Sequence, residues 1–131
     1  MTGDRANTTA AVTPQDVLAF WRTAGPDKWF AKEPTFDAEI AARFGAAWRA
    51  AADGRLAQWE ATPDGALALV IVLDQFPRNM FRGQAGTYET DAVARAVADR
   101  ALGRGFDRQV PHEERQFFYL PFNAPVDKLA T

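Results

Sequence analysis

The chain has 131 residues, of which 47% are hydrophobic and 24% are charged, which is ordinary for one globular domain. Its 15 basic and 17 acidic side chains give a net charge of -2, so the composition offers no positive surface for nucleic acid. Cysteine is absent and His112 is the one histidine, which excludes disulfides, thiolate metal sites and histidine-rich metal sites.

No apolar run approaches the ~20 residues that a membrane-spanning helix needs. The N-terminal residues also lack the apolar core of a signal peptide. We therefore expect a cytoplasmic protein without membrane or nucleic-acid partners, and we predict no cofactor. Residues 1–12 show no periodicity and are expected to form a disordered tail, whereas residues 13–122 are expected to form one helical domain.

The first predicted helix begins after Thr13 and Pro14, which read as an N-cap hydroxyl and a proline at the first helical position. Its core face is set by apolar residues at helical spacing, namely Val17, Phe20 and Trp21. Gly25 and Pro26 are expected to end this helix. Trp29 and Phe30 follow, and they either cover the core or form the aromatic wall of a ligand pocket.

The second predicted helix spans residues 36–52, with Thr35 or Asp37 as its cap. Its apolar stripe contains Phe36, Ile40, Phe44, Ala47, Trp48 and Ala51. A short helical turn should follow, with Trp59 packing inward.

The most apolar stretch of the chain, ALALVIVL at residues 66–73, suits a buried strand or a buried helix equally well. The residues around it favour a helix over 63–75, because Thr62 can cap it and Pro63 can open it. Pro77 is expected to end this helix and to move Phe76 away from helical geometry.

The fourth predicted helix spans residues 87–103, with Thr87 or Thr90 as its cap, and the fifth runs from Pro111 to Pro121. Glu113 and Glu114 are expected to be solvated at the start of the fifth helix, where the helix dipole favours acidic side chains. No alternating strand pattern appears, so the sequence predicts an all-α fold of about five helices arranged as antiparallel hairpins.

A polar cluster follows the central apolar run. Asp74 falls in the last helical turn, where the helix dipole disfavours an acid, so we expect it to meet a cation. The candidates are Arg78, Arg82 and Arg115. The cluster is either a structural ion pair that fixes the turn or part of a polar pocket at the helix end.

Two long segments, LDQFPRNMFRG at residues 73–83 and ERQFFYLPF at residues 114–122, resemble the bacterial family catalogued as domain of unknown function 924. The segment VLAFW at residues 17–21 and the Trp29-Phe30 pair are also similar to that family. The resemblance implies a tetratricopeptide-like helical fold, and it implies no established activity.

In that family the YLPF segment runs on into a Met-His-Ser-Glu stretch and a further helical segment. Here Asn123 follows Phe122, and residues 123–131 resemble an irregular or vector-derived tail. We therefore expect a chain that is truncated or altered after Phe122. Loss of the following helices would expose a large apolar face on the fifth helix, including Phe117 and Phe118, and favour a homo-oligomer formed through it.

The candidate ligand site combines Asp74, Gln75, Arg78, Asn79, Arg115 and Tyr119. Arg115 and Tyr119 are four residues apart, so they share one helix face. Two arginines and a tyrosine could hold a carboxylate or a phosphate, because the guanidinium group is a forked donor. The alternative is a buried polar network that fixes the register of the helices.

Three functions fit these residues. The first is a module that binds a small anion or a peptide. The second is a hydrolase-like enzyme with Asp74 as an acid–base group and an incomplete site, and the third is a purely structural interaction module. His112 is expected to be an exposed residue of the first helical turn rather than a base, so the catalytic residues are unknown and no metal site is predicted.

Overall fold

The structure is a computed structural model and describes residues 12–123 of the chain. The tails predicted for residues 1–12 and 123–131 lie outside this range, except for Val12 and Asn123. Val12 packs against the hydrophobic core. Within the described range all regular secondary structure is helical, which confirms the predicted all-α class. The tetratricopeptide-like arrangement remains a prediction.

The first helices follow from their capping residues. Helix α2 (Pro14–Ala24) begins in a capping box, in which the Asp16 amide donates to the Thr13 hydroxyl and the Thr13 amide donates to the Asp16 carboxylate. Gly25 ends it with a positive φ, and the single-turn helix α3 (Pro26–Trp29) follows. Trp29 is buried, as the core interpretation predicts, and its indole nitrogen donates to the Trp21 carbonyl at 2.7 Å.

Helix α4 (Pro34–Ala52) buries the predicted stripe but starts differently from the prediction. Its N-cap is Glu33, which makes no capping hydrogen bond, so the assignment of Thr35 or Asp37 as the cap is wrong. Asp37 is not available as a cap because its carboxylate accepts hydrogen bonds from Asn79 and Arg82. The next turn, a 3-10 helix at Ala57–Ala61, buries Trp59 as predicted.

Helix α5 (Pro63–Val70) begins where the sequence predicts, with the Thr62 hydroxyl accepting from the Gly65 amide at 3.0 Å. The prediction that Pro77 ends this helix is wrong. The chain passes through a π turn (Ile71–Gln75) and continues as helix α6 (Phe76–Met80). Phe76 itself is helical, with φ of -59° and ψ of -38°.

Thr90 explains how a buried helix passes through Pro77. In a regular α-helix the amide at position 77 would donate to the Leu73 carbonyl, and proline has no such amide. The Leu73 carbonyl instead accepts from the Thr90 hydroxyl at 2.7 Å. The same hydroxyl oxygen accepts from the Trp48 indole nitrogen at 3.1 Å. The Leu73 carbonyl therefore has a partner although the proline cannot donate to it.

Helix α7 (Asp91–Gly103) is shorter than the predicted fourth helix, because residues Ala85–Tyr88 form a separate 3-10 turn. Thr90 is the N-cap by position, but its side chain does not cap the helix, since its hydroxyl donates to the Leu73 carbonyl. The Thr87 hydroxyl likewise donates elsewhere, to the Phe81 carbonyl. Thr90 is thus the N-cap, one of the two predicted positions, but without a side-chain capping hydrogen bond, and Thr87 is not the cap.

The predicted fifth helix is broken into short pieces. After a 3-10 turn at Phe106–Gln109, the chain forms a second 3-10 turn at His112–Glu114, helix α8 (Gln116–Tyr119) and a third 3-10 turn at Leu120–Phe122. The prediction that Glu114 is solvated is wrong. Its buried carboxylate accepts from Arg22 Nε at 2.8 Å and from Arg22 Nη2 at 2.9 Å, which ties this segment to α2.

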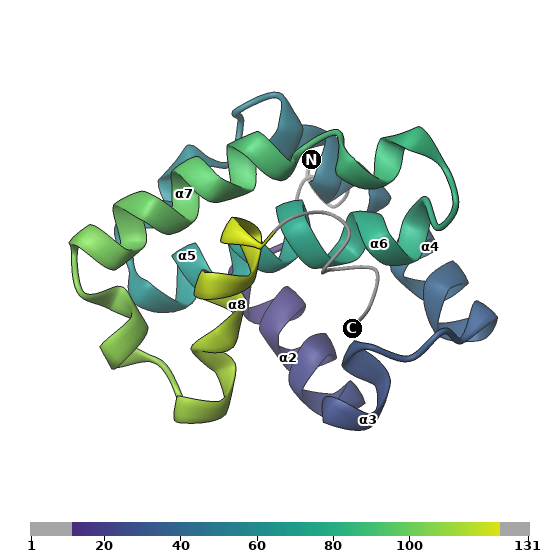
Figure 1. Cartoon of the computed structure of the whole chain (residues 1–131), viewed down its shortest axis with the longest axis horizontal. Helices are drawn as coiled ribbons and strands as arrows, with labels where there is room; N and C mark the ends of the chain where they lie inside the picture. The colour runs from purple at the N-terminus through teal and green to yellow at the C-terminus, as the bar shows by residue number, and fades with distance from the viewer. Residues whose placement is uncertain (1–11, 124–131) are drawn as a thin grey trace, which may run out of the picture.

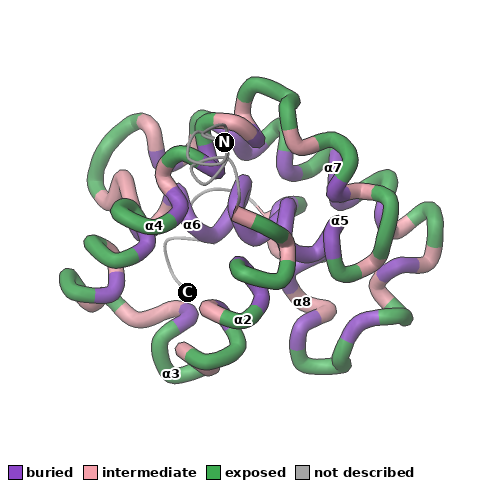
Figure 2. The backbone as a smooth tube through the Cα atoms, turned by 180° about the vertical axis from the view of Figure 1, so that it is seen from behind, coloured by how far each residue is buried: buried purple, intermediate pink, exposed green. Residues whose placement is uncertain are grey.

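The continuous rod formed by α5, the π turn and α6 lies at the centre of the molecule (Figure 1). Helices α2 and α7 pack against α5, α4 packs against α6, and α8 packs against both α5 and α7. Figure 2 shows the result: the rod is buried along most of its length, whereas the surrounding helices bury one side each.

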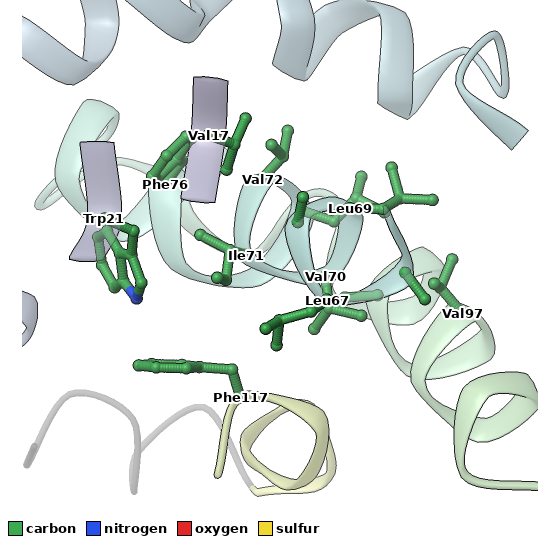
Figure 3. Packing of buried hydrophobic residues seen from close by; sticks show 14 of the residues in the cluster. Val17, Trp21, Leu67, Leu69, Val70, Ile71, Val72, Phe76, Val97 and Phe117 are labelled. Atoms are coloured by element: carbon green, nitrogen blue, oxygen red, sulfur yellow. The ribbon is translucent and has the colours of Figure 1, made fainter. Parts of the chain in front are cut away.

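Aromatic rings fill the space between the rod and helices α2, α3 and α8. Phe117 lies edge to face with Trp21, with ring centroids 5.6 Å apart, and with Trp29 at 5.0 Å. The Trp21 indole nitrogen is buried and makes no hydrogen bond among the described residues. In Figure 3 it lies on the side of the indole that is turned toward the Phe117 ring. Phe117 therefore anchors α8 in the core.

The surface of α8 differs from the prediction. Phe117 and Phe118 are fully buried, so the expected large apolar face on the fifth helix is not present. The exposed rings of this segment are Tyr119, with 45% of its surface accessible, and Phe122, with 47%. Self-association of the chain remains a prediction. None of the helices in residues 12–123 is long and apolar enough to cross a membrane.

Candidate functional site

The polar residues of the candidate site begin where the π turn meets α6. Asp74 lies in the π turn with 1% of its surface exposed, and Gln75 beside it is also buried. The Gln75 amide nitrogen donates to Asp74 Oδ2 at 3.0 Å. Two adjacent buried polar side chains are costly unless they are paired, and this contact pairs them.

Arg78, one turn further along in α6, is half-buried. Burial lowers the pKa of its guanidinium group, and the nearby Asp74 carboxylate opposes that shift. Arg82 lowers the Arg78 pKa further, whereas Tyr88 and Asp91 raise it. Arg78 stays a cation at neutral pH, since arginine does not lose its proton in proteins. Of the three predicted partners of Asp74, the structure thus brings Arg78 close enough to interact.

Asn79 and Arg82 meet around Asp37 of α4. Asn79 Nδ2 donates to Asp37 Oδ1 at 2.8 Å, and Arg82 donates from Nε and Nη2 at 2.9 and 3.1 Å. Arg82 Nη2 also donates to the Ala31 carbonyl at 3.4 Å. This bidentate pair fixes the Arg82 guanidinium group in the segment that follows α6, and it links that segment to α4.

These side chains surround a small pocket of about 20 Å³, enough space for one water-sized group. Four polar side chains line it: Gln75, Arg78, Asn79 and Arg82. The rest of its lining is Trp29, at the end of α3, and the two residues that follow, Phe30 and Ala31. Trp29 and Phe30 therefore pack against the core and also form part of the pocket wall. From the sequence alone, these two roles were alternatives.

Arg115 and Tyr119 do not line this pocket. The Tyr119 hydroxyl donates to the Asp107 carboxylate at 2.7 Å, and this hydrogen bond raises the pKa of Tyr119. Arg115 lies near enough to Tyr119 to oppose that shift, and its buried Nε makes no hydrogen bond among the described residues. The predicted site is thus divided into Gln75, Arg78 and Asn79 at the pocket and a second group at α8.

Asp37, Arg82 and Asp91 also act on the polar cluster, although they are not among the site residues predicted from the sequence. Asp37 was interpreted as a helix cap, and Arg82 only as a possible partner of Asp74. Residues 75, 78, 79 and 82 have the i, i+3, i+4, i+7 spacing of one helix face. That signal was hidden by the assumption that Pro77 ends the helix.

The described residues provide little for acid–base or metal chemistry. His112 is exposed, as predicted. No group of three or more potential metal-ligating side chains occurs within residues 12–123. The pocket lining contains no carboxylate and no histidine. The arrangement can donate hydrogen bonds to an acceptor, and it offers no obvious group to abstract a proton.

Comparisons with known proteins agree with the fold and leave the activity open. Residues 17–125 match the family described as bacterial protein of unknown function (DUF924). The solved structure of a protein of unknown function from Agrobacterium tumefaciens is similar, with a TM-score of 0.83 and 50% sequence identity. The similarity covers 87% of this chain and 64% of that chain, so the present chain spans less than two thirds of its relative.

No curated protein matches the sequence. The family match extends from α2 through α8, and the solved relative shares half of the aligned residues. On this evidence, the chain belongs to the bacterial DUF924 family.

Proposed function

We propose that the chain is a binding module that takes one carboxylate oxygen of a small acid or of a peptide into the pocket beside Arg78. The observation that carries this proposal is the lining itself, in which the side chains of two arginines, Gln75 and Asn79 surround one small space. Such groups donate hydrogen bonds, and arginine matches the geometry of a carboxylate.

The surroundings favour a small ligand group and a modest affinity. Trp29 and Phe30 limit the access of water to the donors, which strengthens each hydrogen bond. Asp37 holds Arg82, while Asp74 and Asp91 act on Arg78, so part of the positive charge is already balanced. We therefore expect a dissociation constant near the millimolar range, which corresponds to about 4 kcal/mol.

Titration calorimetry with sodium acetate tests the proposal. Arg78→Gln should weaken binding at least roughly tenfold, because a hydrogen bond from a charged donor contributes about 1.5–3 kcal/mol. Arg43→Gln is the matched control, since Arg43 is an exposed arginine of α4 that pairs with Glu39 and does not line the pocket.

A second variant separates binding from folding. Ala31→Leu should fill the pocket without removing any member of the polar network, and it should abolish acetate binding at Arg78 while the fold is retained. If acetate binds the parent chain, Arg78→Gln and Ala31→Leu equally well, the proposal is wrong. The cluster would then be a structural network, which is the remaining interpretation.

A hydrolase-like activity has weaker support. Asp74, the acid–base residue that such an enzyme would use, is almost fully buried and does not line the pocket. An acid–base residue needs hydrogen-bond access to its substrate. We therefore place binding first.

A further inference from the structure

A second pocket lies on the opposite side of the rod from α2, between α5, α7 and the 3-10 turn Ala57–Ala61. It has a volume of about 110 Å³. Apart from Gly54, Glu60 and Arg100, its lining is aliphatic: Ala51, Leu56, Ala57, Leu69, Leu73, Val93 and Val97. Ala51, Leu69, Leu73 and Val97 are buried, whereas Ala57 and Val93 are exposed. An aliphatic cavity of about 150 Å³ engineered in another protein binds benzene, so the buried aliphatic side of this pocket suits an apolar group.

The polar groups of this pocket are confined to one ion pair. Arg100 of α7 donates from Nε and Nη2 to the two carboxylate oxygens of Glu60, at 2.8 and 2.9 Å. The Glu60 side chain is 17% exposed and that of Arg100 is 56% exposed, so the pair stands between the aliphatic wall and solvent. Val93, an exposed apolar side chain of α7, also lines the pocket.

The mouth of this pocket offers one donor to an anionic group. Arg104 Nη1 donates to the Glu60 backbone carbonyl at 2.8 Å, and Arg104 does not line the pocket. Both oxygens of the Glu60 carboxylate accept from Arg100, whereas Arg100 Nη1 makes no hydrogen bond among the described residues. Asp99 also acts on Arg100, but it is exposed. Arg100 Nη1 is therefore available to an anionic group.

We propose that this pocket binds a short-chain carboxylic acid, with its alkyl chain against Leu69, Leu73 and Val97 and its carboxylate at Arg100. In proportion to the cavity that holds benzene, the volume accommodates roughly four carbons. The inference is independent of the site at Arg78, which is smaller and lined by polar groups.

Chain length provides the first test. In a titration with acetate, propionate, butyrate and pentanoate, each added methylene should tighten binding roughly fourfold until the pocket is full. The methyl resonances of Leu69, Leu73 and Val97 should shift with the same saturation curve. Equal affinity for acetate and pentanoate, or unmoved methyl resonances at these positions, would overturn the proposal.

A matched pair of substitutions in one 3-10 turn provides the second test. Ala57→Leu places a larger side chain in the pocket and should weaken butyrate binding at least roughly tenfold. Ala57 and Ala61 are both exposed, and only Ala57 lines the pocket. Ala61→Leu makes the same change at the other end of the turn and should bind like the parent. Equal butyrate affinity in both variants contradicts the proposal. If Ala57→Leu does not fold, the titration with acids of increasing chain length decides whether the pocket binds them.

The head group is tested with butan-1-ol and butylamine. Butyrate should bind more tightly than either, because only its head group is an anion that can accept from Arg100 Nη1. Tighter binding of butylamine would overturn the assignment of a carboxylate ligand. Ala31→Leu, which fills the Arg78 pocket, should leave the chain-length dependence unchanged, so failure of one site is distinguishable from failure of the other.

Discussion

The Thr90 hydroxyl connects three elements of the fold through a single side chain. It donates to the Leu73 carbonyl in the π turn and accepts from the Trp48 indole of α4, while the residue itself precedes α7. Both partners are buried, so neither can exchange this contact for water. The Thr90 side chain therefore provides hydrogen bonds to the rod and to α4, and none to the N-terminus of α7.

Thr90→Val preserves the shape of the side chain and removes both hydrogen bonds. We predict a loss of about 2–4 kcal/mol in the free energy of unfolding, because each buried polar group left unpaired costs about 1–3 kcal/mol. Urea unfolding measures this change. Thr23→Val, at an exposed position near the end of α2, is the control and should change stability by less than about 0.5 kcal/mol. Identical unfolding midpoints for the two variants would contradict the assigned role of Thr90.

Tyr119 provides a prediction about pH. Its hydrogen bond to Asp107 raises the pKa of the phenol in the folded chain. A raised pKa stabilises the folded state below the pKa of an unfolded tyrosine, and this contribution is lost as the pH rises through the folded pKa. In absorbance titrations at alkaline pH, Asp107→Asn should therefore lower the pKa of Tyr119, with Tyr119→Phe identifying its signal. An unchanged titration curve in Asp107→Asn would show that the contact does not form in solution.

At the scale of elements, the rod depends on close packing at its first turn. A Cβ atom added at Gly65 of α5 would lie 2.0 Å from the Trp59 carbonyl oxygen, a contact with backbone that a rotamer change cannot relieve. Gly45, in the middle of α4, has no atom within 4 Å of the corresponding position. Gly65 is therefore required by a close approach of the backbone, whereas Gly45 is not required by packing.

We predict opposite effects for alanine at these two positions. Gly65→Ala should destabilise the fold by at least about 1–3 kcal/mol, because the first turn must move away from Trp59. Gly45→Ala should stabilise it by about 0.5–1 kcal/mol, since alanine favours a helix over glycine and meets open space. Thermal unfolding of the pair checks both signs. A stabilising Gly65→Ala would show that α5 and the preceding turn do not approach each other this closely.

Local signals in the sequence predict the starts of the helices better than their ends. Thr13 and Thr62 cap helices because their hydroxyls meet amides three residues ahead, an interaction that is local in the chain. The passage through Pro77 could not be predicted in this way, since it depends on Thr90, which is 17 residues further along. At Pro77 a tertiary contact, and not the local sequence, determines that the helix continues.

In the candidate site, too, contacts between neighbours in the chain could be predicted, and contacts between distant residues could not. Asp74 and Arg78 are neighbours on one helix, so their interaction is visible in the spacing. The contact of Arg82 with Asp37 joins residues 45 positions apart, and the contact of Glu114 with Arg22 joins residues 92 apart. Such pairs depend on how the helices pack, and a single sequence carries little information about that.

At the scale of the whole molecule, the C-terminal segment is part of the core. Phe117 of α8 contacts rings from α2 and α3, and the Trp21 indole nitrogen lies on the side of the indole that is turned toward the Phe117 ring (Figure 3). The ion pair between Arg22 and Glu114 adds a second connection between the two ends of the described chain.

We therefore predict that Phe117→Ala destabilises the protein by about 3–5 kcal/mol, the usual cost of removing a buried ring. Phe122→Ala, a change at a half-exposed ring of the same segment, should cost far less, on the order of 0.5 kcal/mol. Chemical unfolding of both variants provides the comparison. Similar stabilities would show that α8 is not docked in solution as described here.

Nitrogen-15 NMR of the arginine side chains during a titration with acetate tests the proposed site at Arg78. We predict that the Nε–H resonances of Arg78 and Arg82, which line the polar pocket, shift along one saturable curve. The resonance of Arg43, an exposed arginine of α4, should stay unchanged under the same conditions. Equal shifts for all three arginines, or no shift at Arg78, would contradict a binding site at the end of the central rod.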